Sequence, residues 1–309
     1  MRALALALAL SACASRAAPP PRCAEPVTAA APRPRAITPS LPTLRLENLR
    51  FHDRADCAAG ECRVEGASPF APAQPASQDG ATTLPPAMAW LQVVHPGATV
   101  VVPRRASTDL LGVALVGEVS LDRVGAPQVA PVRARPWTAF LLPDGDAVLR
   151  AAGSDPVAVL LVTATGDAPA SDRGQDWVLQ DLVSAETLSW ADGAVHARVA
   201  FEAPRSPRAS LGVLIASDDA PVAEHAHDGA WELLAAVSAA GRLHVPAQTV
   251  PGTTLTLAAR DRTVTEGTIA YVPAGVRHAW MPDGTHPLIA VQVYAPAGPE
   301  QRFRGLAGR

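Results

Sequence analysis

The feature that most constrains the fold is a series of short apolar runs separated by turn residues, which begins near residue 86 and continues almost to the C-terminus. Clear examples are Leu111 to Leu121, Val157 to Val162, Leu211 to Ala216 and Leu288 to Tyr294. Runs of strand length that are bounded by Gly, Pro and Asp, with little helical periodicity, are typical of sandwiches and barrels of strands. The sequence therefore predicts an all-β fold.

Two neighbouring segments near the middle of the chain carry more local signals. Asp192-Gly193 is a dipeptide typical of tight hairpin turns. Apolar residues then occupy every second position from Val195 to Phe201, with His196 and Arg198 between them, as in a strand with one buried face. We expect a half-buried strand after this turn, and one short helix before it over Asp176 to Leu188.

Chain length and composition bound the number of domains and exclude two classes of partner. The 309 residues suffice for two ordinary domains once a targeting and linker region is removed, and 48% of them are apolar. Only 18% of the residues are charged, and the formal net charge is −3. This balance gives no electrostatic basis for binding nucleic acid or for a polybasic contact with a membrane.

The N-terminus has the features of an export signal. Met1-Arg2 precede an apolar run that is too short to cross a bilayer and that ends in small residues. The tetrad from Leu10 to Cys13 resembles the bacterial lipobox, in which the signal is cleaved before a cysteine that carries lipid. The resemblance implies a signal peptide at residues 1–12 and a lipid on Cys13; an ordinary signal peptide that is cleaved elsewhere is the alternative. We therefore expect a protein of the bacterial cell envelope, anchored through its N-terminal lipid and facing the periplasm or the outer surface.

The segment after the signal differs in composition from the rest of the chain. Residues 13–43 are rich in Pro and Ala, which favours an extended, disordered tether over packed structure. A poorly defined connecting segment follows at 44–85, with one expected strand from Leu44 to Phe51. Cys57 and Cys62 flank a loop with a central Gly, and in an oxidising compartment this favours a small disulfide over a metal pair. Cys23 is then left unpaired within the tether.

The residue pattern with the clearest chemistry begins at His225. On a strand, His225 and His227 point to the same face, and Asp228-Gly229 supplies a turn after which Glu232 returns on a neighbouring strand. Two imidazoles and a carboxylate that converge in this way suit a divalent transition metal. Such a site usually takes one more protein ligand.

A second segment supplies that ligand and carries a family resemblance. His278 follows the turn Pro273-Ala274-Gly275, itself preceded by Gly267 and a strand-like run. The two segments resemble the two motifs of the cupin family: two His separated by one residue, then four residues and Glu; and Gly, five residues, Pro-x-Gly, two residues and His. The resemblance implies a jelly-roll barrel in which a divalent metal ion (Mn, Fe, Ni, Cu or Zn) is bound by four ligands, His225, His227, Glu232 and His278.

The first half contains a degenerate copy of the same unit. Leu111 to Leu121, with Gly117, resembles the strand pair of the first motif, and Pro143-Asp144-Gly145 is followed by Val148 where the metal-binding His would stand. The resemblance therefore implies two tandem cupin-type barrels, a metal-free one at residues 86–170 and a metal-binding one at residues 171–300.

The sequence leaves the activity open between two classes. A site with three His and one Glu retains open coordination positions, which suits an Fe- or Mn-dependent dioxygenase or decarboxylase of small organic substrates. A non-catalytic ligand-binding or structural envelope protein is the alternative, because fold does not decide function.

The sequence also offers candidates for the pocket around the metal. Tyr271 and Arg277 are candidates for the pocket mouth, and Trp280, two residues after His278 on the expected strand, is a further pocket-lining candidate. We expect a small-molecule ligand or substrate, and pairing of two copies into a homodimer is compatible with the fold.

Overall fold

The expected all-β fold is confirmed by a computed structural model, which describes residues 34–46, 49, 86–103, 107–125, 130–142, 146–166, 177–203, 205–254 and 256–307, and the backbone of 61–65. The described residues form 22 strands, one turn of 3-10 helix (η2, Pro299–Gln301) and one α-helix (α1, Arg302–Ala307). The predicted signal peptide, Cys13, Cys23, most of the tether and the Cys57–Cys62 disulfide lie outside the described residues.

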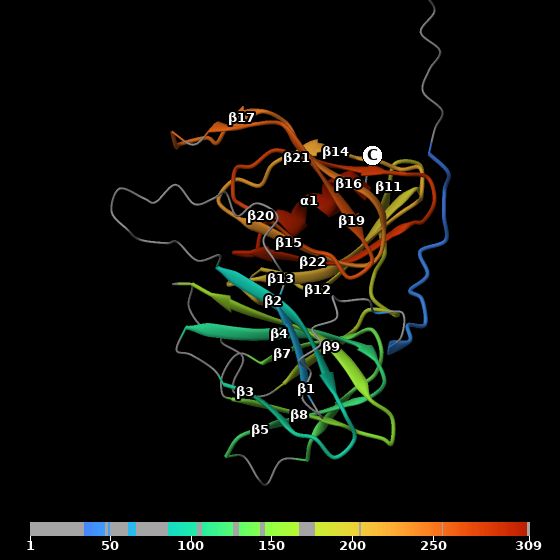
Figure 1. Ribbon diagram of the computed structural model, residues 1–309, viewed down its shortest axis with the longest axis vertical. Helices are drawn as coiled ribbons and strands as arrows, with labels where there is room; N and C mark the ends of the chain where they lie inside the picture. The colour runs from blue at the N-terminus through green and yellow to red at the C-terminus, as the bar shows by residue number, and fades with distance from the viewer. Residues whose placement is uncertain are drawn as a thin grey trace, which may run out of the picture. The chain divides into compact units, whose positions relative to one another are not determined.

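The first half consists of two antiparallel sheets (Figure 1). The larger sheet contains, in spatial order, β1 (Glu61–Glu65), β2 (Ala87–Val94), β9 (Val157–Thr165), β4 (Thr108–Val116), β7 (Thr138–Leu142) and β10 (Val178–Asp181). The smaller sheet contains β3 (Val100–Val102), β8 (Ala147–Ala151), β5 (Val119–Arg123) and β6 (Val132–Ala134). Neighbouring strands are antiparallel throughout both sheets.

The second half repeats this arrangement in the same chain order. Its larger sheet contains β11 (Leu188–Trp190), β12 (Val195–Phe201), β13 (Ser210–Ala216), β22 (Leu288–Ala295), β15 (Trp231–Ser238) and β20 (Ile269–Val272). Its smaller sheet contains β14 (Val222–His225), β21 (His278–Pro282), β16 (Ala240–Val245) and β19 (Arg260–Thr265), and β17 (Gln248–Thr249) pairs with β18 (Thr256–Leu257) in a separate hairpin. The strand order 3-8-5-6 of the first half thus matches 14-21-16-19 of the second, as expected for an internal repeat.

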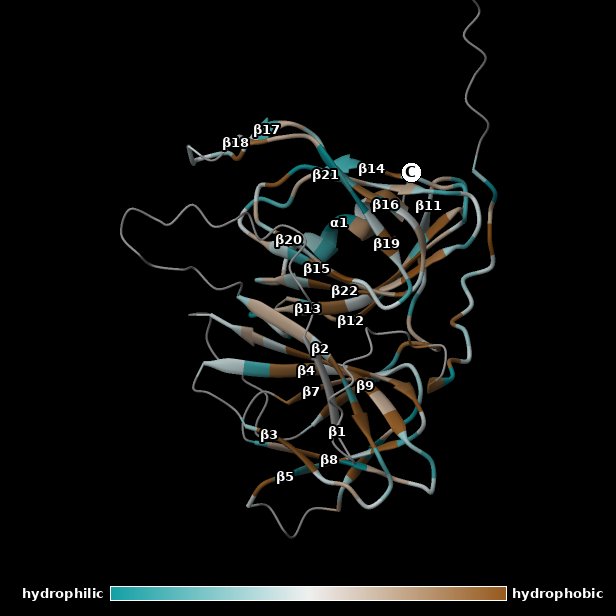
Figure 2. Ribbon diagram, viewed as in Figure 1, coloured by the Kyte–Doolittle hydropathy of each residue, from teal (hydrophilic) through white to brown (hydrophobic). Residues whose placement is uncertain are grey.

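The main hydrophobic core lies between the two larger sheets. One face of the first sheet contributes Leu91, Leu111 and Leu160 to it, from β2, β4 and β9, and one face of the second sheet contributes Val213 and Val291. The opposite faces of the same strands line the interiors of the two barrels. Strands that are buried on both faces have continuous apolar runs instead of alternating ones, which explains why all eight residues of β22 are buried. Figure 2 shows the hydrophobic residues gathered along the strands and the hydrophilic ones mostly in the connections.

At two positions that match metal ligands of the second barrel, Leu110 and Ala147, the interior of the first barrel is apolar. Glu232 pairs with Val272 at the end of β20, and Leu110 pairs with Leu142 at the equivalent end of β7. Ala147, at the start of β8, is the interior counterpart of His278 at the start of β21, because Leu149 and Trp280 two residues later both belong to barrel cores. The motif spacing in the sequence predicted Val148, one residue after Ala147, as the counterpart of His278. It differs by one residue because the connection before β8 is one residue shorter than the connection before β21.

One predicted element is wrong. Within the helix predicted over Asp176 to Leu188, the described residues, 177–188, form strand β10, which pairs with β7, then turns and the start of β11, and not a helix. Pairing with an open sheet edge outweighs the weak helical preference of this sequence. The boundary between the two halves therefore falls after β10. The predicted hairpin at Asp192-Gly193 is confirmed: it joins β11 to β12, and both residues have positive φ.

The end of the predicted tether is bound to the barrels. Residues 34–46 form no strand, and they run along both halves as a segment that we name the strap (residues 34–46). The Ile37 amide donates to Gly193 O at 2.9 Å, and the Trp137 indole donates to Pro42 O at 2.7 Å. The expected strand from Leu44 is absent from its described residues, where Leu46 is a 3-10 position.

Candidate metal centre

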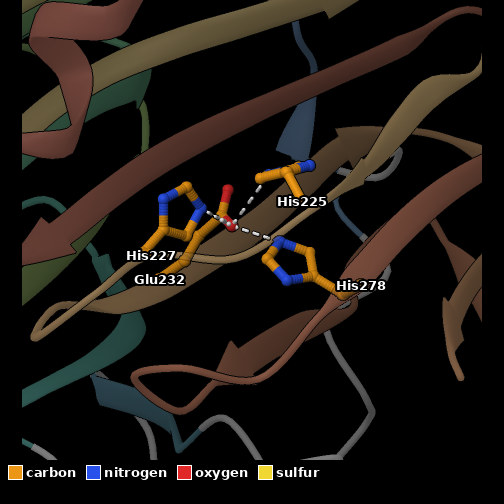
Figure 3. Close-up of side chains that lie close together, drawn as sticks. All are labelled: His225, His227, Glu232 and His278. Atoms are coloured by element: carbon orange, nitrogen blue, oxygen red, sulfur yellow. Dashed lines mark hydrogen bonds and ion pairs between the residues drawn. The ribbon is translucent and has the colours of Figure 1, made fainter. Parts of the chain in front are cut away.

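Four side chains converge at one end of the second barrel (Figure 3). His225 ends β14 and His278 begins β21, where the two residues are register partners. Glu232 is the second residue of β15, in the facing sheet, and His227 lies in the connection between β14 and β15. The turn at Asp228-Gly229 therefore carries the chain from one sheet to the other, and not between neighbouring strands of one sheet as expected.

The three imidazoles surround a single carboxylate oxygen. Glu232 Oε2 lies 2.7 Å from His278 Nε2, 2.9 Å from His227 Nε2 and 3.9 Å from His225 Nε2. His227, Glu232 and His278 are each at most 4% exposed. Two of these contacts are hydrogen bonds and the third ring nitrogen lies just beyond hydrogen-bonding distance, so the four side chains form one compact donor set.

Backbone groups fix the orientation of the rings. The Nδ1 of His225 donates to Ala223 O at 2.7 Å and the Nδ1 of His278 donates to Val276 O at 2.9 Å, which turns each Nε2 toward the centre. The Gly275 amide donates to His227 O at 2.9 Å. Gly275 has φ +74°, a conformation that favours glycine, so the Pro-x-Gly turn positions both His278 and His227.

The second oxygen of Glu232 is also held. Gln292 Nε2 donates to Glu232 Oε1, and the Tyr294 hydroxyl lies 3.5 Å from the same oxygen. Both residues belong to β22, next to β15, and Tyr294 is the register partner of Glu232. Sequence reasoning missed these two residues, although a Gln and a Tyr two positions apart in the apolar run from Leu288 are a visible signal of a polar site on one face.

The electrostatics of the group favour neutral rings at His225 and His227 beside an ionised carboxylate. Burial, with a contribution from the nearby His278, lowers the pKa of His225 to about 4. Burial also lowers the pKa of His227, against the opposing effect of Glu232. Burial alone would raise the pKa of Glu232, but the charge of His278 and the hydrogen bonds from His227 and His278 hold it well below its usual value. Neutral His and ionised Glu are the protonation states that bind metals.

The donor set fits a divalent transition-metal ion. One ligand atom from each of His225, His227, Glu232 and His278 lies within 4.8 Å of the other three. Donors that share one ion at about 2.1 Å lie roughly 3 to 4 Å apart, so a small outward movement of Glu232 suffices. Imidazole with one carboxylate suits Mn, Fe, Ni, Cu and Zn.

Arg302, from α1, contacts this group directly. Its Nη2 donates to His225 Nε2 at 3.1 Å and to the Tyr294 hydroxyl at 3.2 Å, and its Nη1 lies 3.3 Å from His227 Nδ1. No signal in the sequence marked Arg302, because it lies beyond the last strand and outside both motifs.

A cavity of about 370 Å³ opens onto the group. Its polar end is formed by His225, Glu232, His278, Arg302 and Gln292, and Glu224 also lines it. The remaining wall is largely apolar and includes Trp190, Leu214, Leu234, Leu243, Trp280, Leu288, Phe303 and Leu306.

The two residues predicted at the pocket mouth are not in this cavity. The Tyr271 hydroxyl accepts from the Ala89 amide at 2.8 Å, in the core between the two halves. The Arg277 side chain is 59% exposed and pairs with Glu224. Trp280, two residues after His278 on β21, does line the cavity, as the period of a strand requires.

Comparison with known proteins identifies the fold. No protein-family model and no curated protein sequence matches this chain. Among solved structures, a variant of oxalate decarboxylase from Bacillus subtilis aligns with a TM-score of 0.58 and 12% identity, over 77% of this chain and 74% of the other. The same enzyme at pH 4.6 aligns with a TM-score of 0.55 and 13% identity, over 69% of each chain. The fold is that of a bicupin.

A third structure, from a study of the Mn(II) centres of Bacillus subtilis oxalate decarboxylase, aligns with a TM-score of 0.57 and 12% identity over 77% of this chain and 74% of the other. At this identity the likeness concerns the bicupin fold alone. In the described part of the present bicupin, the candidate metal ligands gather in the second barrel, and Leu110 and Ala147 replace two of them in the first.

Proposed function

We propose that the second barrel binds one divalent transition-metal ion through His225, His227, Glu232 and His278, and that the ion binds a small organic ligand in the adjoining cavity. The convergence of three Nε2 atoms on one buried carboxylate oxygen carries this proposal. A buried cluster of this composition is costly unless its members are paired or coordinate a metal.

The residues of the chain have distinct tasks in this function. Val276 O and Ala223 O hold the proton of two imidazoles at Nδ1, so that Nε2 is free to coordinate. Gln292 holds one oxygen of Glu232 and leaves the other for the ion. When bound, the metal supplies Lewis-acid or redox chemistry at its open positions. The apolar wall excludes water and holds the ligand's body.

Metal analysis of the purified full chain, prepared without an affinity metal, tests the proposal. We expect about one equivalent of metal in the wild type and a large loss in His278→Ala. His286→Ala is the matched control, because His286 is exposed and bonds only to Thr285 among the described residues. A wild-type chain that takes up no Mn, Fe, Ni, Cu or Zn even after reconstitution would overturn the proposal.

A dioxygenase or decarboxylase activity is the second candidate, and the cavity that opens onto three of the four ligands favours it over a purely structural metal. Glu224 lines the same cavity and provides a carboxyl group that can move a proton. Oxygen uptake and CO2 release by the metal-loaded chain, with panels of small organic acids, measure the two reactions. A chain that binds metal and ligand without turnover is a ligand-binding protein.

The cellular location belongs to the proposal as well. The Leu10 to Cys13 tetrad supports export and lipid attachment at Cys13. Among the described residues, no helix is long and apolar enough to cross a membrane. Lipid labelling of the wild type that persists in Cys13→Ser would contradict attachment at this residue.

A further inference from the structure

We propose that the ligand of the second barrel is an organic carboxylate with an apolar body, and that Arg302 binds its carboxylate once the metal is in place. The inference rests on the proposed metal binding and names the ligand class and the residue that selects it. Three observations support it: the contacts of Arg302, the unpaired donors at the cavity, and the apolar wall.

The contacts of Arg302 are incompatible with metal coordination. Its Nη2 uses the lone pair of His225 Nε2, which a metal ion needs. Its Nη1 donates to His227 Nδ1, which requires the His227 proton on Nε2, the atom that faces Glu232. Coordination through Nε2 moves that proton to Nδ1 and ends the hydrogen bond. Metal binding therefore releases the guanidinium from both histidines.

The released guanidinium has no anionic partner among the described residues. Arg302 forms no ion pair within that part of the chain, whereas Arg304 in the same helix pairs with Glu186 and Glu202. Arg302 remains anchored beside the cavity, because the next residue, Phe303, is buried and stacks on Trp190 with ring centroids 5.4 Å apart. A divalent ion and Arg302 together outweigh the single charge of Glu232, so the loaded site attracts an anion.

Two buried donors beside the cavity also lack acceptors. Arg302 Nε and Trp280 Nε1 have no hydrogen-bond partner among the described residues, and both residues line the cavity. These two donors therefore have hydrogen-bonding capacity left for an acceptor, once the release of Arg302 from the histidines opens access to them. A carboxylate supplies two acceptor oxygens, and it matches the planar fork of a guanidinium.

The rest of the cavity determines the other end of the ligand. A volume of about 370 Å³ lies in the range of small-molecule sites and exceeds what a minimal dianion fills. Its wall away from the metal ligands is formed mainly by aromatic and aliphatic side chains, among them Trp190, Leu234, Leu243, Trp280, Leu288 and Phe303. An apolar chain or ring gains free energy on this wall, and a second carboxylate does not.

Isothermal titration calorimetry with hexanoate, on the metal-loaded and the metal-free full chain, tests the inference. Hexan-1-ol has the same apolar body without the charge, and oxalate has charges without the body. We expect hexanoate to bind the metal-loaded wild type at least about 10-fold more tightly than either of them. We also expect binding to weaken on removal of the metal, because Arg302 returns to the histidines.

Two substitutions in α1 separate recognition from helix packing. Arg302→Gln should weaken hexanoate binding about 10-fold or more while metal affinity is retained or increased, because a competing cation is removed. Arg304→Gln, which removes an arginine from the same helix, should leave hexanoate affinity unchanged. Equal hexanoate affinity in the wild type and Arg302→Gln overturns the inference, as does tighter binding of oxalate than hexanoate. The metal content of the same samples distinguishes failure of the proposed function from failure of this inference. A wild type that contains no metal refutes both. A metal-loaded wild type whose hexanoate affinity is the same with and without Arg302 refutes the inference alone.

Discussion

Gln292 shows how a residue outside both motifs controls the candidate metal centre. Its amide is the close partner of Glu232 Oε1, and it fixes the carboxylate plane so that Oε2 faces the three imidazoles. Residues that orient metal ligands typically change metal affinity about 10- to 100-fold when they are replaced. The orientation of Glu232 thus depends on the strand beside it as well as on its own position.

We therefore predict that Gln292→Leu weakens metal binding about 10- to 100-fold, because Glu232 loses the donor that holds its second oxygen. Competition with a metal chelator of known affinity measures the change. Gln180→Leu, on β10 of the first half, is the matched control and should leave the affinity unchanged. An unaltered affinity in Gln292→Leu would show that Tyr294 and the strand geometry suffice.

The histidines also predict a pH dependence. The pKa of His225 is about 4 in the folded protein, below its ordinary value of 6.5, so the folded state favours the neutral ring. The folded protein therefore takes up this proton less readily than the unfolded chain, and the stabilisation is present above pH 6.5 and is lost as the pH falls towards 4. His227 is shifted in the same direction. The pKa of Glu232 is also lowered, so its contribution is lost at still lower pH.

We predict that the metal-free protein loses stability as the pH falls from about 7 to about 4, by about 2–3 kcal/mol for His225 alone. Urea unfolding at a series of pH values measures this loss. His225→Phe removes the titrating group and should flatten the profile between pH 6.5 and about 4. A profile with the same slope in both proteins would assign the dependence to other groups.

At the level of elements, the strap ties the N-terminal segment to both barrels. Arg198 on β12 donates to Leu182 O at 2.8 Å, Val183 O at 2.9 Å and Pro39 O at 2.7 Å. His196 on the same face contacts Ile37 O at 3.0 Å. Two polar residues expected at the surface of a half-buried strand are therefore buried beneath the strap.

We predict that Arg198→Met lowers the free energy of unfolding by about 2–4 kcal/mol, because three backbone carbonyls, of Leu182, Val183 and Pro39, lose a charged donor while the side-chain volume is kept. Arg133→Met is the control, since its side chain is 65% exposed and its ion pair with Glu118 lies at the surface, and it should change stability by less than about 0.5 kcal/mol. Urea unfolding gives both values. Equal losses of unfolding free energy in Arg198→Met and Arg133→Met would mean that the hydrogen bonds of Arg198 beneath the strap do not stabilise the fold.

The sequence predicted these elements unevenly, for physical reasons. The strand from Val195 to Phe201 and its hairpin turn follow from local chemistry and are confirmed. The burial of His196 and Arg198 depends on the strap, which lies 159 positions away along the chain where Ile37 meets His196. The four candidate ligands follow from motif spacing, whereas Arg302 joins them through tertiary packing of α1, which no local pattern reports.

At the level of the whole molecule, the two halves share one core. Each larger sheet buries one face in its own barrel and the other face against the partner sheet. A buried ion pair crosses the same region: Arg208 Nη1 lies 2.7 Å from Asp109 Oδ1, and the side chains are 5% and 1% exposed. Either half alone would expose a wide apolar face.

This shared core predicts that the two barrels unfold together, although among the described residues only the second has the candidate metal ligands. Metal release in urea reports on the second barrel. Tryptophan fluorescence reports on the whole described fold, because tryptophans lie in both halves. If the barrels unfold together, the urea transitions measured by these two probes should coincide. A first-half transition that leaves the metal bound would contradict the shared core and make the first barrel an independent domain.

The buried ion pair between Asp109 and Arg208 gives a prediction of its own. Asp109→Leu should lower the free energy of unfolding in urea by about 3–5 kcal/mol, because it leaves Arg208 buried without its carboxylate partner. The double variant Asp109→Leu with Arg208→Met should recover most of this loss.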